Sequence, residues 1–497
     1  MKKLLKKDNI LTYDGNFLKE YYDTVKELIK SNCFMLFLLG TSFLTYGFYL
    51  YFHAIGADDL DRDRFFVEYG LIRQGRFVGQ ILHEVFDIMW NHAFFTMAIT
   101  IILFIVASIF TAALLKMISG IKNNFMIALF TALMLVFPTN AFIFEFILAT
   151  VLTSLEYILS IFAVVYTIHF ILEKKIKSSL VVISLLVFAI SSYESFVFVY
   201  FTMILFFILF SLRINSRFKT QSIIKFLLYV CILIIVSTLI ESLVSNLLIY
   251  ILDLEKINRV AISESMWFKS PSMYTIKRLI FNIFINYFFI GLLDFSHMYY
   301  VLIVFFMFVA TFFVSDRKYL LRSILIIILI NISVYGITVV EGKVQLARTM
   351  QTFSTFVMFG SGYVYIALCK KWIKKTFIIV VSFAIYSSAH LQNLYYEREW
   401  KNHLKQENFL NTLMHDVEYQ YGSGQNVYFI GKYDVEQKWY DDSVLQITKD
   451  SYPGKIFNYI NKRFYDSKLT NEGSDYYAYA YYSSSVLIDV FGDYAKT

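Results

Sequence analysis

Residues 93–117 read AFFTMAITIILFIVASIFTAALLKM, with Lys116 as the one charged side chain of the stretch. A helix rises about 1.5 Å per residue, so about 20 apolar residues span the hydrocarbon core of a bilayer. Ten further apolar stretches follow the same pattern, at 31–53, 125–137, 153–172, 179–192, 196–212, 226–250, 299–315, 323–340, 353–369 and 376–391. Two of them, 125–137 and 179–192, are short, and we expect neighbouring protein to set their outer ends. The sequence therefore predicts an all-α polytopic membrane protein of about eleven transmembrane helices.

The composition argues against a soluble domain and against a nucleic-acid-binding protein. Hydrophobic residues make up 58% and charged residues 17% of the 497 positions, whereas a soluble domain carries about a quarter charged residues. There are only three prolines, so the apolar stretches contain few helix breakers. The net charge of +7 comes largely from basic residues in short loops between apolar stretches, which is the membrane-protein pattern. We expect membrane lipid and no nucleic acid among the partners.

The distribution of Lys and Arg predicts the orientation. Basic residues occupy the first thirty positions and every second connection, whereas the alternate short loops, 138–140 and 193–195, contain none. Positive loops stay in the cytoplasm, so the N-terminus is cytoplasmic and eleven crossings place the C-terminus outside. The first apolar stretch is too long for a signal-peptide core and is interpreted as a signal anchor. The residues that carry the asymmetry are Lys174, Lys175, Lys177, Arg213, Arg217, Lys219, Lys225, Arg317, Lys318, Arg322, Lys370, Lys371, Lys374 and Lys375.

Three parts of the chain follow from this topology: a cytoplasmic segment 1–30, a transmembrane domain 31–391 with long outer loops 54–92 and 251–298, and an extracytoplasmic domain 392–497. In the last part the periodicity changes. It predicts a helix over 398–420, a break at 422–424, a strand at 426–431, a helix around 455–463 and a strand at 485–491. We expect a small α/β domain on the outer side of a bacterial cytoplasmic membrane.

An acidic run follows the first apolar stretch directly. Asp58 and Asp59 are adjacent, and Asp61 lies two positions further on. Paired carboxylates raise each other's proton affinity, which suits one of them to work as a general base. Two other interpretations stay open: a solvated charged loop with no chemistry, and a divalent cation site, which we do not predict.

Arginines in the outer loops are candidates for binding a phosphate. Arg76 follows in the same loop as the acidic run, and Arg348 precedes the apolar stretch 353–369 on the outer side. A guanidinium presents a fork of donors that matches phosphate oxygens. For Arg76 the alternative is an interfacial anchor, and for Arg348 it is pairing with Glu341 or another outer carboxylate.

Several carboxylates lie within or beside apolar stretches, where ionisable groups are costly and are candidates for function. For Glu241 and Asp294 we favour a helix–helix hydrogen bond or a position near the interface. Glu194 is different, because Ser192 to Ser195 form a whole outer turn, and we expect its side chain to face the space beneath the first outer loop. The set is Glu145, Glu156, Glu194, Glu241 and Asp294.

The sequence lacks the common cofactor signatures. It contains no phosphate-binding G-x-x-x-x-G-K-[ST], no dinucleotide-binding G-x-G-x-x-G opening a helix, no H-E-x-x-H and no Cys/His zinc spacing. The three cysteines all fall in apolar stretches, so no disulfide framework is available. We predict no cofactor and no metal.

With these residues, the chain resembles the type II membrane glucosyltransferases that modify O-antigen and related surface polysaccharides, within the GT-C superfamily. The resemblance consists of Asp58-Asp59 and then Arg62 after the first span, Gly75-Arg76-Phe77, the turn Tyr193-Glu194-Ser195, and Arg348 before a late span. The turn of the family usually reads Tyr-Gln, whereas here it reads Tyr-Glu. The resemblance covers the first 400 residues as an order of short features.

The resemblance implies an enzyme of the cell envelope that takes a sugar from a polyprenyl-phosphate donor, with glucose as the expected sugar, and transfers it with inversion to a surface polysaccharide on the outer face. Asp58 or Asp59 is then the catalytic base, and the substrate-binding residues are Asp61, Arg62, Arg76, Tyr193, Glu194 and Arg348. Two other classes stay open. A flippase or polymerase is also polytopic, although a flippase should line its spans with charges. A non-catalytic accessory protein should tolerate the loss of Asp58 and Asp59.

Overall fold

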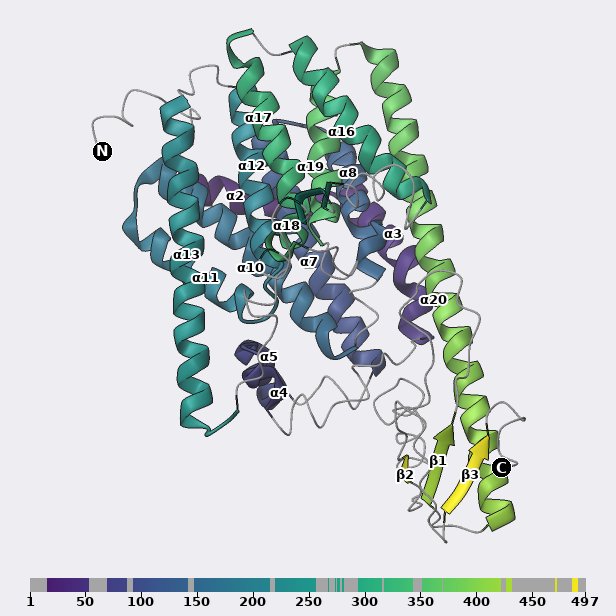
Figure 1. Ribbon diagram of the computed structural model, residues 1–497. Helices are drawn as coiled ribbons and strands as arrows, with labels where there is room; N and C mark the ends of the chain where they lie inside the picture. The colour runs from purple at the N-terminus through teal and green to yellow at the C-terminus, as the bar shows by residue number, and fades with distance from the viewer. Residues whose placement is uncertain are drawn as a thin grey trace.

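The computed structural model (Figure 1) describes most of the predicted membrane domain and parts of the C-terminal region. The described residues are 16–52, 69–86, 93–141, 147–214, 220–255, 294–314, 317–342, 351–368, 370–421, 426–430, 470–471 and 485–489, with short pieces at 267, 273, 275–277 and 279–280.

Helices dominate this part of the chain. In order they are α2 (Phe17–Lys30), α3 (Asn32–Tyr51), α4 (Gly70–Arg73), α5 (Phe77–Phe86), α7 (Ala93–Ser119), α8 (Asn124–Val136), the 3-10 turn η3 (Pro138–Asn140), α10 (Ile147–Glu173), α11 (Ile176–Ile190), α12 (Phe196–Ile214), α13 (Thr220–Ile251), α16 (Asp294–Val314), α17 (Arg317–Val334), α18 (Gly336–Glu341), α19 (Thr352–Ala367) and α20 (Lys371–Tyr421). Three short strands follow α20: β1 (Asn426–Ile430), β2 (Thr470–Asn471) and β3 (Ser485–Asp489).

Ten of the eleven predicted apolar stretches each fall on one helix, and the stretch 323–340 falls on two. Within the described residues, six helices are long and apolar enough to cross a membrane: Asn32–Tyr51, Phe94–Ser119, Val151–Glu173, Phe196–Arg213, Ile223–Ile251 and Lys371–Glu397. Four shorter apolar helices join them, at Asn124–Val136, Ile176–Ile190, Tyr299–Phe313 and Tyr319–Val334. The chain is thus an α-helical membrane protein, and the count of eleven crossings stays a prediction.

One predicted span is interrupted. The stretch 323–340 is two helices, because α17 ends at Val334 and the short α18 begins at Gly336. A Cβ atom at Gly336 would lie 2.0 Å from the ring of Phe198 on α12, so only glycine allows this approach.

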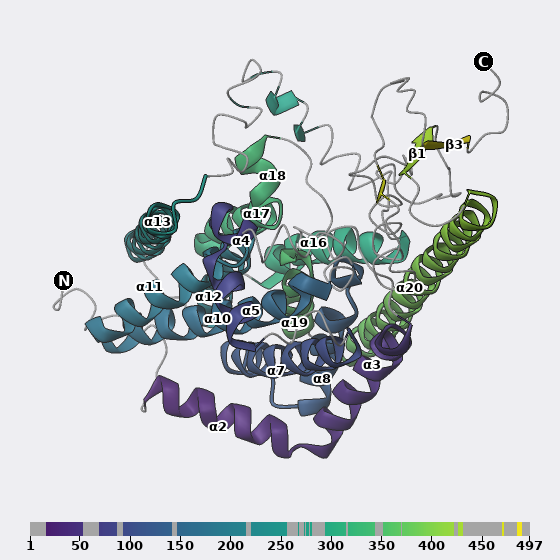
Figure 2. The ribbon, with the colours of Figure 1, turned by 90° about the horizontal axis from the view of Figure 1, so that it is seen from below.

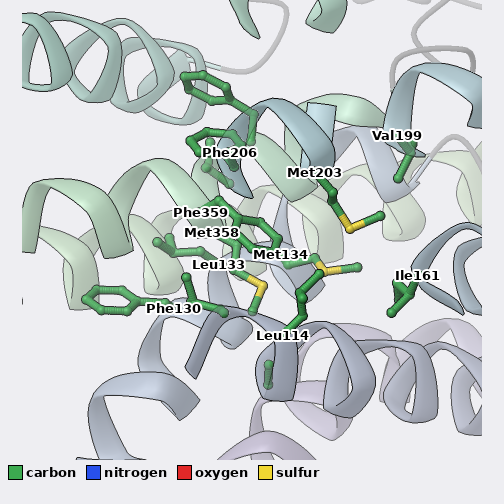
Figure 3. Packing of buried hydrophobic residues seen from close by; sticks show 14 of the residues in the cluster. Leu114, Phe130, Leu133, Met134, Ile161, Val199, Met203, Phe206, Met358 and Phe359 are labelled. Carbon is green, nitrogen blue, oxygen red and sulfur yellow. The ribbon is translucent and has the colours of Figure 1, made fainter. Parts of the chain in front are cut away.

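Helix α8 lies at the centre of the bundle. Every residue from Met126 to Val136 is buried, and the helix contacts α3, α7, α19 and α20. Figure 3 shows this packing. The labelled side chains there are Leu114 of α7, Phe130, Leu133 and Met134 of α8, Ile161 of α10, Val199, Met203 and Phe206 of α12, and Met358 and Phe359 of α19.

The C-terminal end of α8 is held by protein, as its shortness predicts. The carbonyl of Leu135 accepts a hydrogen bond from the Tyr46 hydroxyl of α3. The Asn140 amide donates to the carbonyl of Met134 at 2.7 Å, and the Gln392 amide of α20 donates to that of Val136 at 2.7 Å. The last carbonyls of a helix need such partners, and lipid supplies none.

The N-terminal helix α2 is amphipathic and lies along one edge of the bundle (Figure 2). Phe17, Tyr21, Val25 and Leu28 form its buried face, and it contacts α7, α3 and α10. Lys116 at the end of α7 donates to Glu27, and this hydrogen bond holds the pKa of Glu27 below its ordinary value.

The ends of other helices also carry basic groups that the orientation prediction assigns to the cytoplasm. The Arg213 guanidinium at the end of α12 donates to the carbonyls of Tyr363 and Ile366, at 3.2 and 2.6 Å. It thereby caps the C-terminal end of α19, where the helix dipole favours a positive charge. The orientation itself stays a prediction.

The C-terminal region begins on α20, which runs without a break from Lys371 to Tyr421. The predicted span 376–391 and the predicted helix 398–420 are therefore parts of one helix. The strands form a parallel sheet in the order β2-β1-β3, with Asn426 opposite Ser485 and Ile430 opposite Asp489. Both strands predicted here are confirmed, whereas the predicted helix around 455–463 lies outside the described residues.

Candidate functional site

Arg76 is held by two short helices that dock on the bundle. The backbone turns between α4 and α5 at Gly75, whose φ of +81° favours glycine. There the Gly75 N–H donates to the Ile72 carbonyl at 2.8 Å, and the Arg76 N–H donates to the Leu71 carbonyl at 2.7 Å. The turn fixes where the Arg76 side chain begins.

Apolar contacts anchor the same two helices. Ile72, Phe77 and Val78 pack with Ile249 of α13, and Figure 1 shows α4 and α5 beside one end of that helix. A Cβ atom at Gly79 would lie 3.1 Å from Leu152 of α10. The segment of α4 and α5 therefore lies directly against α10 and α13.

The guanidinium of Arg76 lies over the ring of Tyr193, with Cζ 4.6 Å from the ring centroid. A cation over an aromatic face is attracted by the ring's negative surface. Two features that the sequence singled out separately, Gly75-Arg76-Phe77 and the Tyr193-Glu194-Ser195 turn, thus meet in space.

The Tyr193-Glu194-Ser195 turn also contacts the chain just before α19, near the predicted site residue Arg348. The Ser195 hydroxyl donates to Oε1 of Gln351 at 2.7 Å, and both residues are buried. The Tyr157 hydroxyl of α10 donates to the Gln351 carbonyl at 3.0 Å. Gln351 is only three positions after Arg348, so the turn holds the end of the segment that carries Arg348.

Glu156 lies next to Tyr157 on α10 and is completely buried. Within the described residues, neither of its carboxylate oxygens has a hydrogen-bond partner. The Arg76 guanidinium lies near enough to interact electrostatically with this carboxylate, and Nε of Arg76 is likewise buried and without a partner in the described part of the chain. Arg76, Glu156 and Tyr193 therefore form one local group, which we call the inner cluster.

Comparison with known proteins bears on this arrangement. The family model for glucosyl transferase GtrII matches residues 47–365. The chain belongs to the glucosyl transferase GtrII family. The match runs from within α3 to within α19 and includes the whole inner cluster. No curated protein and no solved structure matches the chain significantly.

Membership in the glucosyl transferase GtrII family confirms the resemblance to type II membrane glucosyltransferases that the sequence indicated. The family's glucosyl transfer is consistent with a helical membrane domain whose polar groups gather beside the turn between α4 and α5. It does not assign a role to any residue of the inner cluster.

Several predicted site residues fall outside the described residues. Asp58, Asp59, Asp61 and Arg62 lie within 53–68, and Arg348 lies within 343–350. Their predicted roles stay predictions. Of the predicted residues that the structure describes, it brings together Arg76 and Tyr193, and it places Glu194 on the exposed side of the same turn.

Glu241 borders this region from α13. A Cβ atom at Gly75 would lie 3.5 Å from its Oε1 and 3.4 Å from Oγ of Ser245. The sequence favoured a helix–helix hydrogen bond or a position near the interface for Glu241, and its carboxyl group lies against the turn between α4 and α5. Among the described residues, no group of three or more His, Cys, Asp or Glu side chains is placed to hold a metal ion.

Sequence reasoning gave no role to two members of this region. Glu156 could be recognised as a candidate because it is an ionisable residue in an apolar stretch, but its nearness to Arg76 depends on how α5 docks on α10. Gln351 could be recognised only weakly, as a polar residue before an apolar stretch. Neither contact follows from spacing along the chain.

Proposed function

We propose that this protein transfers glucose from a polyprenyl-phosphate donor to a surface polysaccharide at the outer face of the bacterial cytoplasmic membrane. The observation that supports the proposal is the inner cluster: a guanidinium fixed over an aromatic ring, beside an outer loop, in a chain of the glucosyl transferase GtrII family. A polyprenyl phosphate cannot leave the bilayer, so its headgroup must be met at the membrane surface.

The reaction exchanges one bond to the anomeric carbon for another. The acceptor hydroxyl attacks that carbon, the bond from the carbon to the phosphate oxygen breaks, and polyprenyl phosphate leaves with the bonding electrons. Attack from the opposite face inverts the configuration. Asp58 or Asp59 takes the proton of the hydroxyl, as a positioned general base. The donor carries its own leaving group, so no cofactor is required.

Charge develops on the phosphate as the bond breaks, and Arg76 and Arg348 are proposed to stabilise it. The Tyr193 ring holds the Arg76 guanidinium in place, so little reorganisation accompanies the reaction in this proposal. Asp61, Arg62 and Glu194 border this site in the proposal and contact the sugars or the headgroup.

The direct test uses the purified full-length protein in vesicles with polyprenyl-phosphate [¹⁴C]glucose and the acceptor polysaccharide. We expect label to enter the polymer, with release of unlabelled polyprenyl phosphate. UDP-[¹⁴C]glucose in the same vesicles serves as the control and should give no transfer. Movement of the labelled lipid between leaflets without transfer would instead support a flippase and refute the proposal.

A further inference from the structure

The inner cluster contains a buried carboxylate that the proposed reaction does not use. Glu156 is fully buried, and in the described part of the chain its two oxygens have no hydrogen-bond partner. Burying a polar group without a hydrogen bond costs free energy, so such a group is retained where something else compensates it. Arg76 is its charged neighbour, but the two do not form an ion pair within hydrogen-bonding distance.

The two groups are complementary to a hydroxyl. A carboxyl group accepts hydrogen bonds at its carbonyl oxygen, and a guanidinium only donates them. A hydroxyl can both donate and accept, so the hydroxyls of one sugar can donate to an oxygen of Glu156 and accept from the Nε–H of Arg76. The pair therefore suits a group rich in hydroxyls.

Arg76 can serve both ends of a sugar phosphate at once. Its guanidinium has five N–H donors, and the Nε–H is buried near Glu156 while the ring of Tyr193 covers one face. The terminal nitrogens stay available for a phosphate. In a glycosyl phosphate the sugar hydroxyls lie next to the phosphate, so the two parts match the two sides of this arginine.

We propose that Glu156 binds the sugar of the donor by accepting hydrogen bonds from its hydroxyls, and so makes the site recognise a glycosyl phosphate rather than a bare lipid phosphate. This inference rests on the proposed function, since it concerns the donor of that same reaction. It adds a residue that recognises the sugar beside the arginine that is proposed to bind the phosphate.

The test compares two ligands on three proteins. The parent, Glu156→Gln and Glu156→Leu are placed in vesicles, and the Kd is measured for polyprenyl-phosphate glucose and for polyprenyl phosphate. Glutamine keeps one weaker acceptor and leucine keeps none. We expect the Kd of the glucosyl lipid to rise up to about tenfold in the Gln variant and more in the Leu variant, as the loss of hydrogen bonds to the sugar implies. The Kd of polyprenyl phosphate should stay within about twofold.

Folding is checked by the thermal transition of each variant. Since Glu156 has no polar partner in the described part of the chain, Gln and Leu should leave Tm unchanged or raise it. The matched control is Glu173→Gln at the other end of α10, where the carboxylate accepts from the Phe17 N–H at 3.1 Å and pairs with Lys175. It should leave both Kd values unchanged.

Two results would overturn the inference. If both Glu156 variants keep the parental ratio of the two Kd values, the carboxylate does not contact the sugar. If both ligands weaken equally, Glu156 acts on the phosphate through Arg76 instead. Glucosyl transfer by the parent is measured in the same vesicles. If the parent transfers glucose but the ratio of the two Kd values does not depend on Glu156, only this inference fails and the proposed function stands. If the parent neither transfers glucose nor binds the glucosyl lipid, both the inference and the proposed function are refuted.

Discussion

The hydroxyl of Ser195 donates a 2.7 Å hydrogen bond to the side chain of Gln351, and both residues are almost completely buried. Ser195 ends the turn that presents Tyr193 to Arg76, and Gln351 begins the stretch that follows Arg348. One hydrogen bond therefore joins the turn that carries Tyr193, a predicted substrate-binding residue, to the residue three positions after Arg348, which is predicted to bind the donor phosphate.

This bond should couple the two segments energetically. We expect Ser195→Ala to lower the free energy of unfolding by about 1–3 kcal/mol, because a buried polar partner is lost. A double-mutant cycle with Gln351→Leu should give a coupling energy of about 0.5–3 kcal/mol. The measurement is denaturant unfolding of the purified protein in detergent. Ser192→Ala is the control, since Ser192 donates only to the nearby Phe188 carbonyl, and it should show no coupling to Gln351.

The aromatic ring beneath Arg76 should matter more than the hydroxyl of Tyr193. Tyr193→Phe keeps the ring and should retain near-parental glucosyl transfer. Tyr193→Leu removes it and should lower kcat/KM about 2- to 30-fold, the range that a cation–π contact of about 0.5–2 kcal/mol implies. Equal activity of the Phe and Leu variants would show that the ring does not position the guanidinium.

Arg348 is predicted to hold the donor phosphate. Arg348→Ala should fold and reach the membrane at parental levels but use the donor poorly, and Arg348→Lys should restore only part of the activity, because a point charge lacks the fork. The measurement is the KM for polyprenyl-phosphate glucose in vesicles. Full activity of the Ala variant would assign Arg348 to pairing with Glu341 or another outer carboxylate instead.

The topology is open to cysteine labelling from outside the cell. In a variant without Cys33, Cys231 and Cys369, a membrane-impermeant maleimide should label cysteines at Glu84 and Tyr419 and leave those at Lys177 and Lys371 unlabelled. All four positions are exposed in the structure, so accessibility alone does not separate them. Permeabilised cells should label all four. Outside labelling at Lys371 would show that the number of spans is not eleven.

The sequence was sufficient where the signal is local. The apolar stretches predicted from hydropathy are helical in the structure. The prediction of a helix was reliable there because the backbone has few other options in lipid. Hydropathy failed at Tyr335, where α17 gives way to α18 beside a close approach of Gly336 to Phe198 on another helix. It also predicted two elements where α20 is one, because the helix continues after its apolar face ends.

In the inner cluster, too, the sequence indicated the individual residues but not the contacts between them. Arg76, Tyr193 and Glu156 each stood out by residue type and position, and two of them were predicted to bind substrate. That these three lie together depends on docking between α5, α10 and the turn before α12, which no periodicity encodes. Sequence can therefore nominate polar residues of a membrane site, and packing decides which of them face one another.

The prediction on which the function most depends concerns the acidic pair at Asp58 and Asp59. The pair follows the first span by a few residues, so the topology places it at the level of a lipid-phosphate headgroup. Paired carboxylates there can keep one member ready to accept a proton near neutral pH. Loss of a positioned base costs about 10²–10⁴-fold in rate. Asparagine has nearly the size of aspartate, so we expect neither substitution to unfold a loop.

The experiment expresses Asp58→Asn and Asp59→Asn separately in a strain that lacks the native gene. Membrane levels of each variant are confirmed first, and glucose on the surface polysaccharide is then measured. At least one variant should accumulate normally yet leave the polymer without glucose, whereas Asp23→Asn, on the exposed face of α2 and paired only with Lys26, should act like the parent. If both variants glucosylate at the parental level, the base lies elsewhere. Asp61 is then the next residue to test, and the transferase proposal loses its main support.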